Sequence, residues 1–183
     1  MKEFSYSFIQ ECENGNKQSQ KILFEKLYVP MFRTCLRYVN NQSDAEDCLM
    51  RGFLKMFQNL SSFRFEGEHS LFVWVRKIMV NEALMFLRKR HNFFLSLDAE
   101  VEDVSIPSEV IINMDAQDLL QKIQQLPTGY RTVFNLFVVE GYSHQEIAVE
   151  LGISENTSRT QLAKARMKLK KMIEEKEVQN ASC

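Results

Sequence analysis

Apolar residues recur along this chain mainly at the spacing of an α-helix, and the alternation expected of a β-strand is weak. One set repeats every four residues: Leu23, Leu27, Met31, Cys35 and Val39. Pro30 lies inside this set and is expected to disturb or end a helix there, because proline has no N–H to donate. A second set shares one helical face: Leu49, Phe53, Met56, Phe57 and Leu60. Ser43 followed by Glu46 predicts a capping box at the start of this second helix.

Residues 71–90 are apolar over most of the circumference of a helix, so we expect most of this helix to be buried. One narrow strip differs, because Lys77, Asn81 and Arg88 fall within about 40° of one another, with Leu84 between them. Such a strip is suited to a phosphate backbone.

Aromatic residues surround a turn-like segment just before this helix. They are Phe63, Phe65, Phe72 and Trp74, placed around Gly67. Aromatic rings beside basic residues can stack on unpaired bases, and the alternative is that the rings belong to the core. For Trp74 the core interpretation is favoured, because it leads into the buried helix, whereas both remain open for Phe63 and Phe65.

The C-terminal part predicts two short helices joined by a glycine-containing turn. Ser143 and Glu146 form a second capping-box pattern, and Ile147, Ala148 and Leu151 follow on one face. Gly152 stands where a tight turn is needed, and Ser154 is placed to cap the next helix. This order is typical of a helix-turn-helix.

The second of these helices has an apolar face and a polar, basic face. The residues expected to point inward are Ser158, Leu162, Ala165 and Leu169. Those expected to point outward are Asn156, Thr157, Thr160, Ala163 and Lys164, with Arg159 and Gln161 on the flanks. Small, polar and basic side chains suit a helix in the major groove, and the alternative is an ordinary solvated face.

The composition is that of a globular protein, and an acidic middle segment separates two basic ends of the chain. The 183 residues are 45% hydrophobic with a net charge of −1, enough for two small helical domains. Residues 92–121 contain no Lys or Arg but many acids, and we interpret 93–114 as a flexible acidic linker. This predicts an all-α protein with domains at 1–92 and 115–176 and a tail at 177–183.

Several functions are disfavoured by the sequence. The cysteines and histidines are scattered, which disfavours a disulfide framework or a zinc site. The sequence contains no apolar run long enough to span a membrane and no secretory signal, so a cytoplasmic protein without membrane insertion is expected. We find no phosphate-cradling glycine loop and no placed nucleophile, so neither an enzyme with a small-molecule substrate nor a cofactor is expected.

In their order, these motifs resemble the extracytoplasmic-function group of sigma-70 family sigma factors, over about residues 20–172. Three segments carry the resemblance: Ser43–Asp47 with 53–57, Gly67–Asn81 closing with 87–90, and 126–134 with Gly141–Ser154, Thr157 and 163–166. They are similar to the polymerase-binding helix, the segment that opens the minus-10 element and the minus-35 reader.

The resemblance implies a function and residue roles. The chain would bind core RNA polymerase and promoter DNA, and an anti-sigma factor is a further expected partner. The polymerase-binding set would be Asp44, Glu46, Asp47, Met50 and Arg51. The minus-10 set would be Phe63, Phe65, Lys77, Asn81, Arg88, Lys89 and Arg90. The minus-35 set would be Asn156, Thr157, Arg159, Thr160, Gln161, Ala163, Lys164 and Arg166.

The chain departs from the family pattern at four places. Met50 and Arg51 stand where the family usually has Gln and Glu, and Met85 stands where Asp is common. Ser158 replaces an inward-packing Val, and Gln161 replaces a frequent Arg.

Two other classes of protein also fit part of the sequence. An autonomous helix-turn-helix regulator explains the C-terminal part equally well, but not residues 43–57 or the aromatic segment. An adaptor whose helices only bind other proteins is the second alternative, and it predicts that loss of Arg159 and Lys164 has no effect.

Overall fold

The chain is helical throughout the part that the structure describes. The computed structural model describes residues 4–89 and 116–180, and within these ranges it contains no β-strand. The helices are α1 (Tyr6–Glu13), α2 (Lys17–Val39), α3 (Gln42–Gln58), α4 (Glu68–Lys89), α6 (Ala116–Gln124), α7 (Thr128–Phe134), α8 (His144–Leu151) and α9 (Glu155–Asn180). A short 3-10 turn, η1 (Leu60–Ser62), follows α3, and a π-helical turn, η2 (Asn135–Val139), follows α7. The prediction of an all-α protein is confirmed.

The chain divides into two compact units, Met1–Lys89 and Arg90–Cys183. The predicted linker at 93–114 lies outside the described residues. The predicted end of the second domain at residue 176 falls inside α9, which continues to Asn180.

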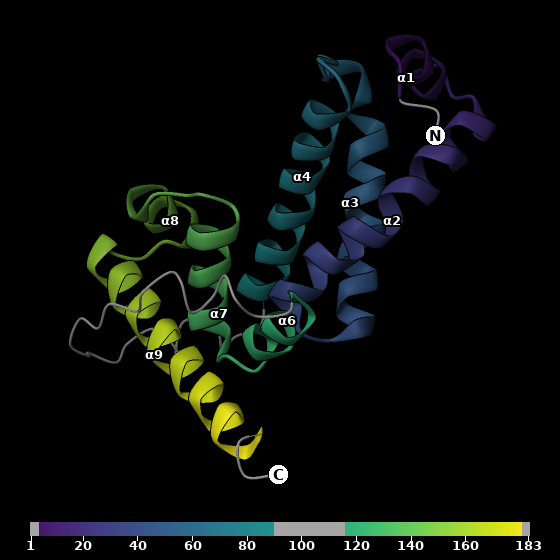
Figure 1. Ribbon diagram of the computed structural model, residues 1–183. Coiled ribbons are helices and arrows are strands. Elements are labelled where there is room, and N and C mark those ends of the chain that lie inside the picture. Colours follow the sequence, from purple (N-terminus) through teal and green to yellow (C-terminus); the bar gives the residue numbers. More distant parts are fainter. Residues whose placement is uncertain (1–3, 90–115, 181–183) are drawn as a thin grey trace. The chain divides into compact units, whose positions relative to one another are not determined.

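In the first unit, α2, α3 and α4 pack against one another, and α1 packs against α2 (Figure 1). The predicted apolar set of α2 is buried, from Leu23 to Val39. Burial also raises the pKa of the Cys35 thiol to about 12, so this thiol is protonated at neutral pH.

Pro30 does not end α2. The helix runs without a break from Lys17 to Val39, so of the two expectations, that Pro30 would disturb the helix or end it, the second is wrong. Leu27 and Met31 on either side of the proline are buried, and their packing offsets the one hydrogen bond that proline removes. The Thr34 hydroxyl donates to the Pro30 carbonyl at 2.9 Å.

The N-cap of α3 is Asn41 and not Ser43. The Asn41 side chain accepts a hydrogen bond from the Asp44 N–H at 3.0 Å, and the helix begins at Gln42. Asn40 just before it has φ 54°, a left-handed conformation that asparagine tolerates better than most residues. The predicted capping box at Ser43 is therefore wrong, because the preceding asparagine already provides the cap.

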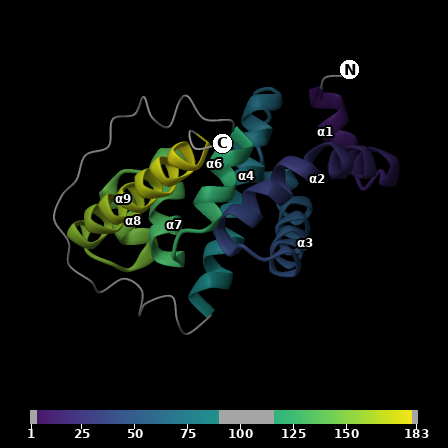
Figure 2. The same ribbon diagram turned by 60° about the horizontal axis from the view of Figure 1, so that its bottom comes forward.

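The second unit is built around α9, which contacts α6, α7 and α8 (Figure 2). Arg131 of α7 is buried and donates to the carbonyl oxygens of Leu126 at 2.7 Å and Gln124 at 3.3 Å, which holds the α6–α7 turn. Burial lowers the pKa of its guanidinium to about 10, so Arg131 remains charged at neutral pH.

The predicted helix-turn-helix is present in this unit, but its second helix, α9, is 26 residues long and not short as expected. Ser143 and Glu146 form the capping box at the start of α8. Gly152 ends α8 with φ 68°, which glycine adopts without strain. The Ser154 hydroxyl then accepts from the Thr157 N–H at 3.0 Å at the start of α9.

Candidate DNA and polymerase interfaces

The beginning of α9 presents part of the predicted minus-35 set to solvent. Asn156 and Arg159 are exposed, while Thr157, Thr160 and Arg166 are half-buried. The Arg159 guanidinium pairs with Glu155 at 2.9 Å, one turn earlier on the same helix. The four residues expected to point inward, from Ser158 to Leu169, are all buried. The apolar face of the predicted reading helix is therefore confirmed.

Three residues of the predicted minus-35 set are buried, which corrects the expected orientation. Ala163 and Lys164, expected to point outward, are each 5% exposed, and Gln161 on the flank is fully buried. The Nζ of Lys164 lies 6.0 Å from the centre of the Tyr130 ring in α7. A helical wheel that considers only α8 and α9 does not predict this burial, because α6 and α7 also pack against α9.

A hydrogen bond joins the two helices of the helix-turn-helix. The buried Ser158 hydroxyl of α9 lies 2.8 Å from Nδ1 of His144, the first residue of α8. The His144 ring stacks on the Phe137 ring, with ring centres 4.5 Å apart. The guanidinium carbon of Arg166 lies 6.0 Å from the centre of the Phe137 ring. A polar contact thus stands where the family usually packs an apolar side chain.

Positive charge also surrounds this histidine. Burial, and after it the charges of Arg159 and Arg166, lower the pKa of His144, while Glu155 acts in the opposite direction. His144 is therefore neutral at pH 7.

The aromatic segment between α3 and α4 forms a small stack. The rings of Phe63 and Trp74 are parallel to within 19°, with centres 4.5 Å apart, and Phe65 meets Phe63 edge to face at 6.4 Å. All three rings are half-buried. The favoured expectation that Trp74 lies in the core is therefore wrong, because its ring packs on Phe63 near the surface.

The basic strip of α4 is interrupted. Lys77, Asn81, Arg88 and Lys89 are exposed, but Leu84 between them is buried. The exposed apolar Met85 lies between Asn81 and Arg88 on this side of α4, so the polar groups do not form one continuous polar strip. Arg90, also predicted to contact the minus-10 element, lies outside the described residues.

The predicted polymerase-binding residues lie on α3. Asp47, Met50 and Arg51 are exposed, and Asp44 and Glu46 are half-buried. Leu54 continues the same side of the helix and is 59% exposed. The surface of α3 therefore combines acidic, apolar and basic side chains within three turns.

Glu82 of α4 was not among the residues predicted from the sequence, and its side chain is only 4% exposed. Its carboxylate lies 2.5 Å from Lys55 Nζ and 3.8 Å from Arg51 Nε, both on α3. One signal was available, since an acid within a mostly apolar helix needs a basic partner when it is buried.

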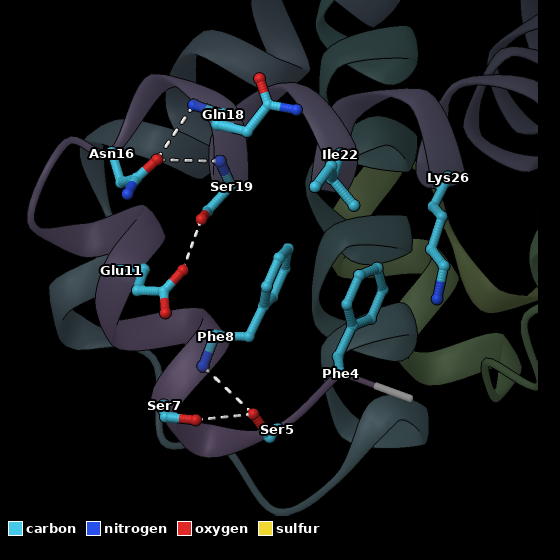
Figure 3. A pocket seen from close by; sticks show the side chains of 10 residues that line it. All are labelled: Phe4, Ser5, Ser7, Phe8, Glu11, Asn16, Gln18, Ser19, Ile22 and Lys26. Atoms are coloured by element: carbon cyan, nitrogen blue, oxygen red, sulfur yellow. Dashed lines mark hydrogen bonds between the residues drawn. The ribbon is translucent and has the colours of Figure 1, made fainter. Parts of the chain in front are cut away.

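A hollow of about 660 Å³ lies between α1, α2 and the segment before α1. Figure 3 shows the rings of Phe4 and Phe8 pointing into it, with Lys26 at one side. The rings stack at 5.1 Å between centres, and Lys26 Nζ lies 4.2 Å from the centre of the Phe4 ring. The residues that line this hollow include no member of the predicted DNA-binding or polymerase-binding sets.

Among the described residues, no helix is long and apolar enough to cross a membrane. The same part of the chain contains no cluster of three or more histidine, cysteine or acidic side chains able to hold a metal ion.

The sequence matches two family profiles, Sigma-70 region 2 over residues 23–93 and Sigma-70, region 4 over residues 116–169. The RNA polymerase sigma factor SigV of Bacillus subtilis is 30% identical over 134 residues, covering 73% of this chain and 78% of the relative. The ECF RNA polymerase sigma-E factor of Haemophilus influenzae is 26% identical over 183 residues, covering 93% of each chain. The sigma factor RpoE of Bartonella quintana, solved with the anti-sigma factor NepR, is 23% identical with a TM-score of 0.49, covering 84% of this chain and 98% of that one.

A helix-turn-helix that follows another helical unit in the sequence is typical of DNA-binding transcription factors. The chain belongs to the extracytoplasmic-function group of the sigma-70 family of RNA polymerase sigma factors. Sigma factors bind core RNA polymerase and promoter DNA to direct the initiation of transcription, and they are not enzymes. The region 2 match also accounts for residues 43–57 and the aromatic segment, which the autonomous regulator left unexplained.

Proposed function

We propose that this sigma factor reads the minus-35 element with the first half of α9. Asn156 and Arg159 contact base edges, and Thr157, Thr160 and Arg166 contact bases or phosphates. The observation that carries this proposal is the exposure of Asn156 and Arg159 at the start of a helix whose opposite face is buried. Arg159 binds a guanine or a phosphate once it leaves Glu155, and an exposed pair of this kind costs only about 0.5 kcal/mol to break.

Gln161, Ala163 and Lys164 have a supporting role in this proposal. Their burial argues that they fix the position of α9 against the rest of the unit. Direct reading of bases then falls to the exposed residues nearer the start of the helix.

The aromatic stack serves the minus-10 element. A base flipped out of the non-template strand packs against Phe63 and Phe65, which offsets the few kcal/mol that unstacking costs. Lys77, Asn81, Arg88, Lys89 and Arg90 bind the phosphates of the adjoining strand. The half-exposed rings support this role, since rings fully inside a core are not accessible to a base.

Polymerase binding belongs to α3 in this proposal, through the acids Asp44, Glu46 and Asp47 and through Met50, with Arg51 at the edge of the same surface. The protein works in the cytoplasm, where core polymerase and promoter DNA are found. An anti-sigma partner remains a prediction from the sequence.

The test is run-off transcription from a library of random promoters by bacterial core polymerase, with and without the full-length chain. We expect enrichment of two-part promoters that require both proteins. Arg159→Ala should lower the preference for the minus-35 half by about 5-fold to 150-fold, equal to about 1–3 kcal/mol for a bidentate base contact.

Lys170→Ala is the matched control. Lys170 is also an exposed base of α9 in an ion pair one turn apart, with Glu174 at 3.8 Å, but it lies three turns beyond Arg159. Its loss should leave the minus-35 preference unchanged. No stimulation of a competent core, together with tight binding of the protein alone to duplex DNA, would favour the autonomous regulator.

A further inference from the structure

Two of the departures from the family pattern lie in one cluster in the structure. Arg51 of α3 and Met85 of α4 both flank Glu82 and Lys55. Lys55 Nζ lies 2.5 Å from the Glu82 carboxylate and 3.9 Å from the Met85 sulfur. Arg51 lies 3.8 Å from the same carboxylate, and its guanidinium is 5.9 Å from the centre of the Phe86 ring. Arg51 and Met85, two of the departures from the family pattern, therefore contact the same buried ion-pair cluster.

The central residue of this cluster is the buried one. The side chain of Glu82 is 4% exposed, whereas those of Arg51 and Lys55 are 48% and 47% exposed. A buried carboxylate is stable only when it is paired, so Glu82 must hold at least one of the two bases against α4. Within the described residues, Glu82 is the one acid that forms an ion pair with Arg51 or with Lys55.

Arg51 and Lys55 lie on the same helix as the acids predicted to bind polymerase, so their charges affect that binding. Asp44 and Asp47 precede them by about one to three turns on the same helix, and we have assigned these acids to polymerase binding. A surface that binds these acids must be basic, because interacting surfaces have complementary charges. Bases at positions 51 and 55 would be repelled by such a surface if their charges were free.

We propose that Glu82 is a positioning residue for polymerase binding: it holds Arg51 and Lys55 against α4 and neutralises one of their two positive charges. The neighbouring Met50 and Leu54, 46% and 59% exposed, then form the apolar contact on this side of α3. The partner surface is a basic patch of core polymerase with an apolar centre. This inference rests on the proposed role of α3.

The test measures binding of the full-length chain to bacterial core polymerase by biolayer interferometry at about 50 mM and 300 mM salt. Glu82→Gln should bind about tenfold more weakly at the lower salt concentration, because two unneutralised bases then face a basic surface. The loss should shrink at the higher concentration, because salt screens the repulsion between exposed charges.

A charge-exchange variant separates positioning from a merely structural role. The double variant Arg51→Glu with Glu82→Gln moves the acid back to α3 and removes one base, so its affinity should return to within about threefold of the wild type. It also keeps the test decisive if Glu82→Gln alone does not fold, since the acid at position 51 can pair with Lys55. The matched control is Glu25→Gln, which removes the same charge from an exposed ion pair of α2 and should leave binding unchanged.

Each outcome has a distinct meaning. If the wild-type chain does not bind core polymerase, the proposed function itself fails. If the wild type binds and Glu82→Gln binds equally well, or if the double variant folds and remains as weak as Glu82→Gln at both salt concentrations, the positioning role is overturned and the proposed function stands.

Discussion

Gly52 is the residue at which the α3–α4 contact can be tested most directly. It lies in the interior of α3, and a β-carbon built on it would lie 2.9 Å from Cε of Met79 in α4 and closer still to Sδ. Met79 is completely buried, so the flexible end of its side chain can move only by displacing the core residues packed around it. Glycine at position 52 therefore permits the close approach of these two helices.

Two opposing effects set the magnitude for Gly52→Ala. Alanine stabilises a helix interior by about 0.5–1 kcal/mol relative to glycine. Added atoms in a well-packed core cost about 1–3 kcal/mol. We expect the clash to dominate, with a net loss of about 1 kcal/mol in the free energy of unfolding.

The assay is urea unfolding followed by tryptophan fluorescence. The chain has a single tryptophan, Trp74 of α4, so this signal reports on the first unit alone. Gly52→Ala should lower the midpoint without changing the slope.

A double-mutant cycle isolates the steric contact. Met79→Ala alone should cost about 2–5 kcal/mol because it leaves a cavity. Combined with Gly52→Ala, it should cost about 1–3 kcal/mol less than the sum of the two single changes, because the added methyl group fills space that Met79 has left. A stabilised single variant, or additive effects, would refute the claim that Met79 fixes the distance between the helices.

Two further predictions concern the sites. His144 has a pKa below its usual 6.5, so folding favours its neutral form, and the stability this gives above pH 6.5 is lost as pH falls through the folded pKa. Thermal unfolding of the second unit by circular dichroism between pH 7.5 and 5.5 should therefore show a larger loss for the wild type than for His144→Gln; equal losses would contradict this. Phe63→Ala removes the ring stacked on Trp74 and should reduce promoter opening, detected by permanganate reactivity, by about 5-fold to 150-fold from the 1–3 kcal/mol of one base–aromatic stack. Unchanged reactivity at the same holoenzyme occupancy would argue that the ring has only a packing role.

The helices were predictable because their signals are local. Periodic apolar residues identified the core face of α2 and of α3, and the Ser143 capping box and Gly152 turn located the helix-turn-helix. The errors arose where two local signals competed. Asn41 caps α3 ahead of Ser43, and packing around Pro30 outweighs the hydrogen bond lost there.

The sites were less predictable because they depend on contacts between helices. A wheel drawn for α9 alone cannot show that Lys164 lies against α7. The bond between His144 and Ser158 and the pairing of Glu82 with Arg51 also join residues far apart in sequence. Ser158 and Arg51 were recognised as departures from the family pattern, but their partners could be identified only in the folded chain.

The π-helical turn after α7 has a consequence for the length of the chain. A π-helical turn holds one more residue per hydrogen-bonded turn than an α-helical turn. Such a turn arises when one extra residue is inserted into an α-helix. Loss of one residue within Asn135–Val139 can therefore be absorbed by a return to α-helical geometry. The same loss inside α8 would rotate every later residue of that helix by about 100° and move Ile147 or Leu151 out of the core. A deletion of one residue in the second unit is thus expected to be tolerated at η2 and not within α8.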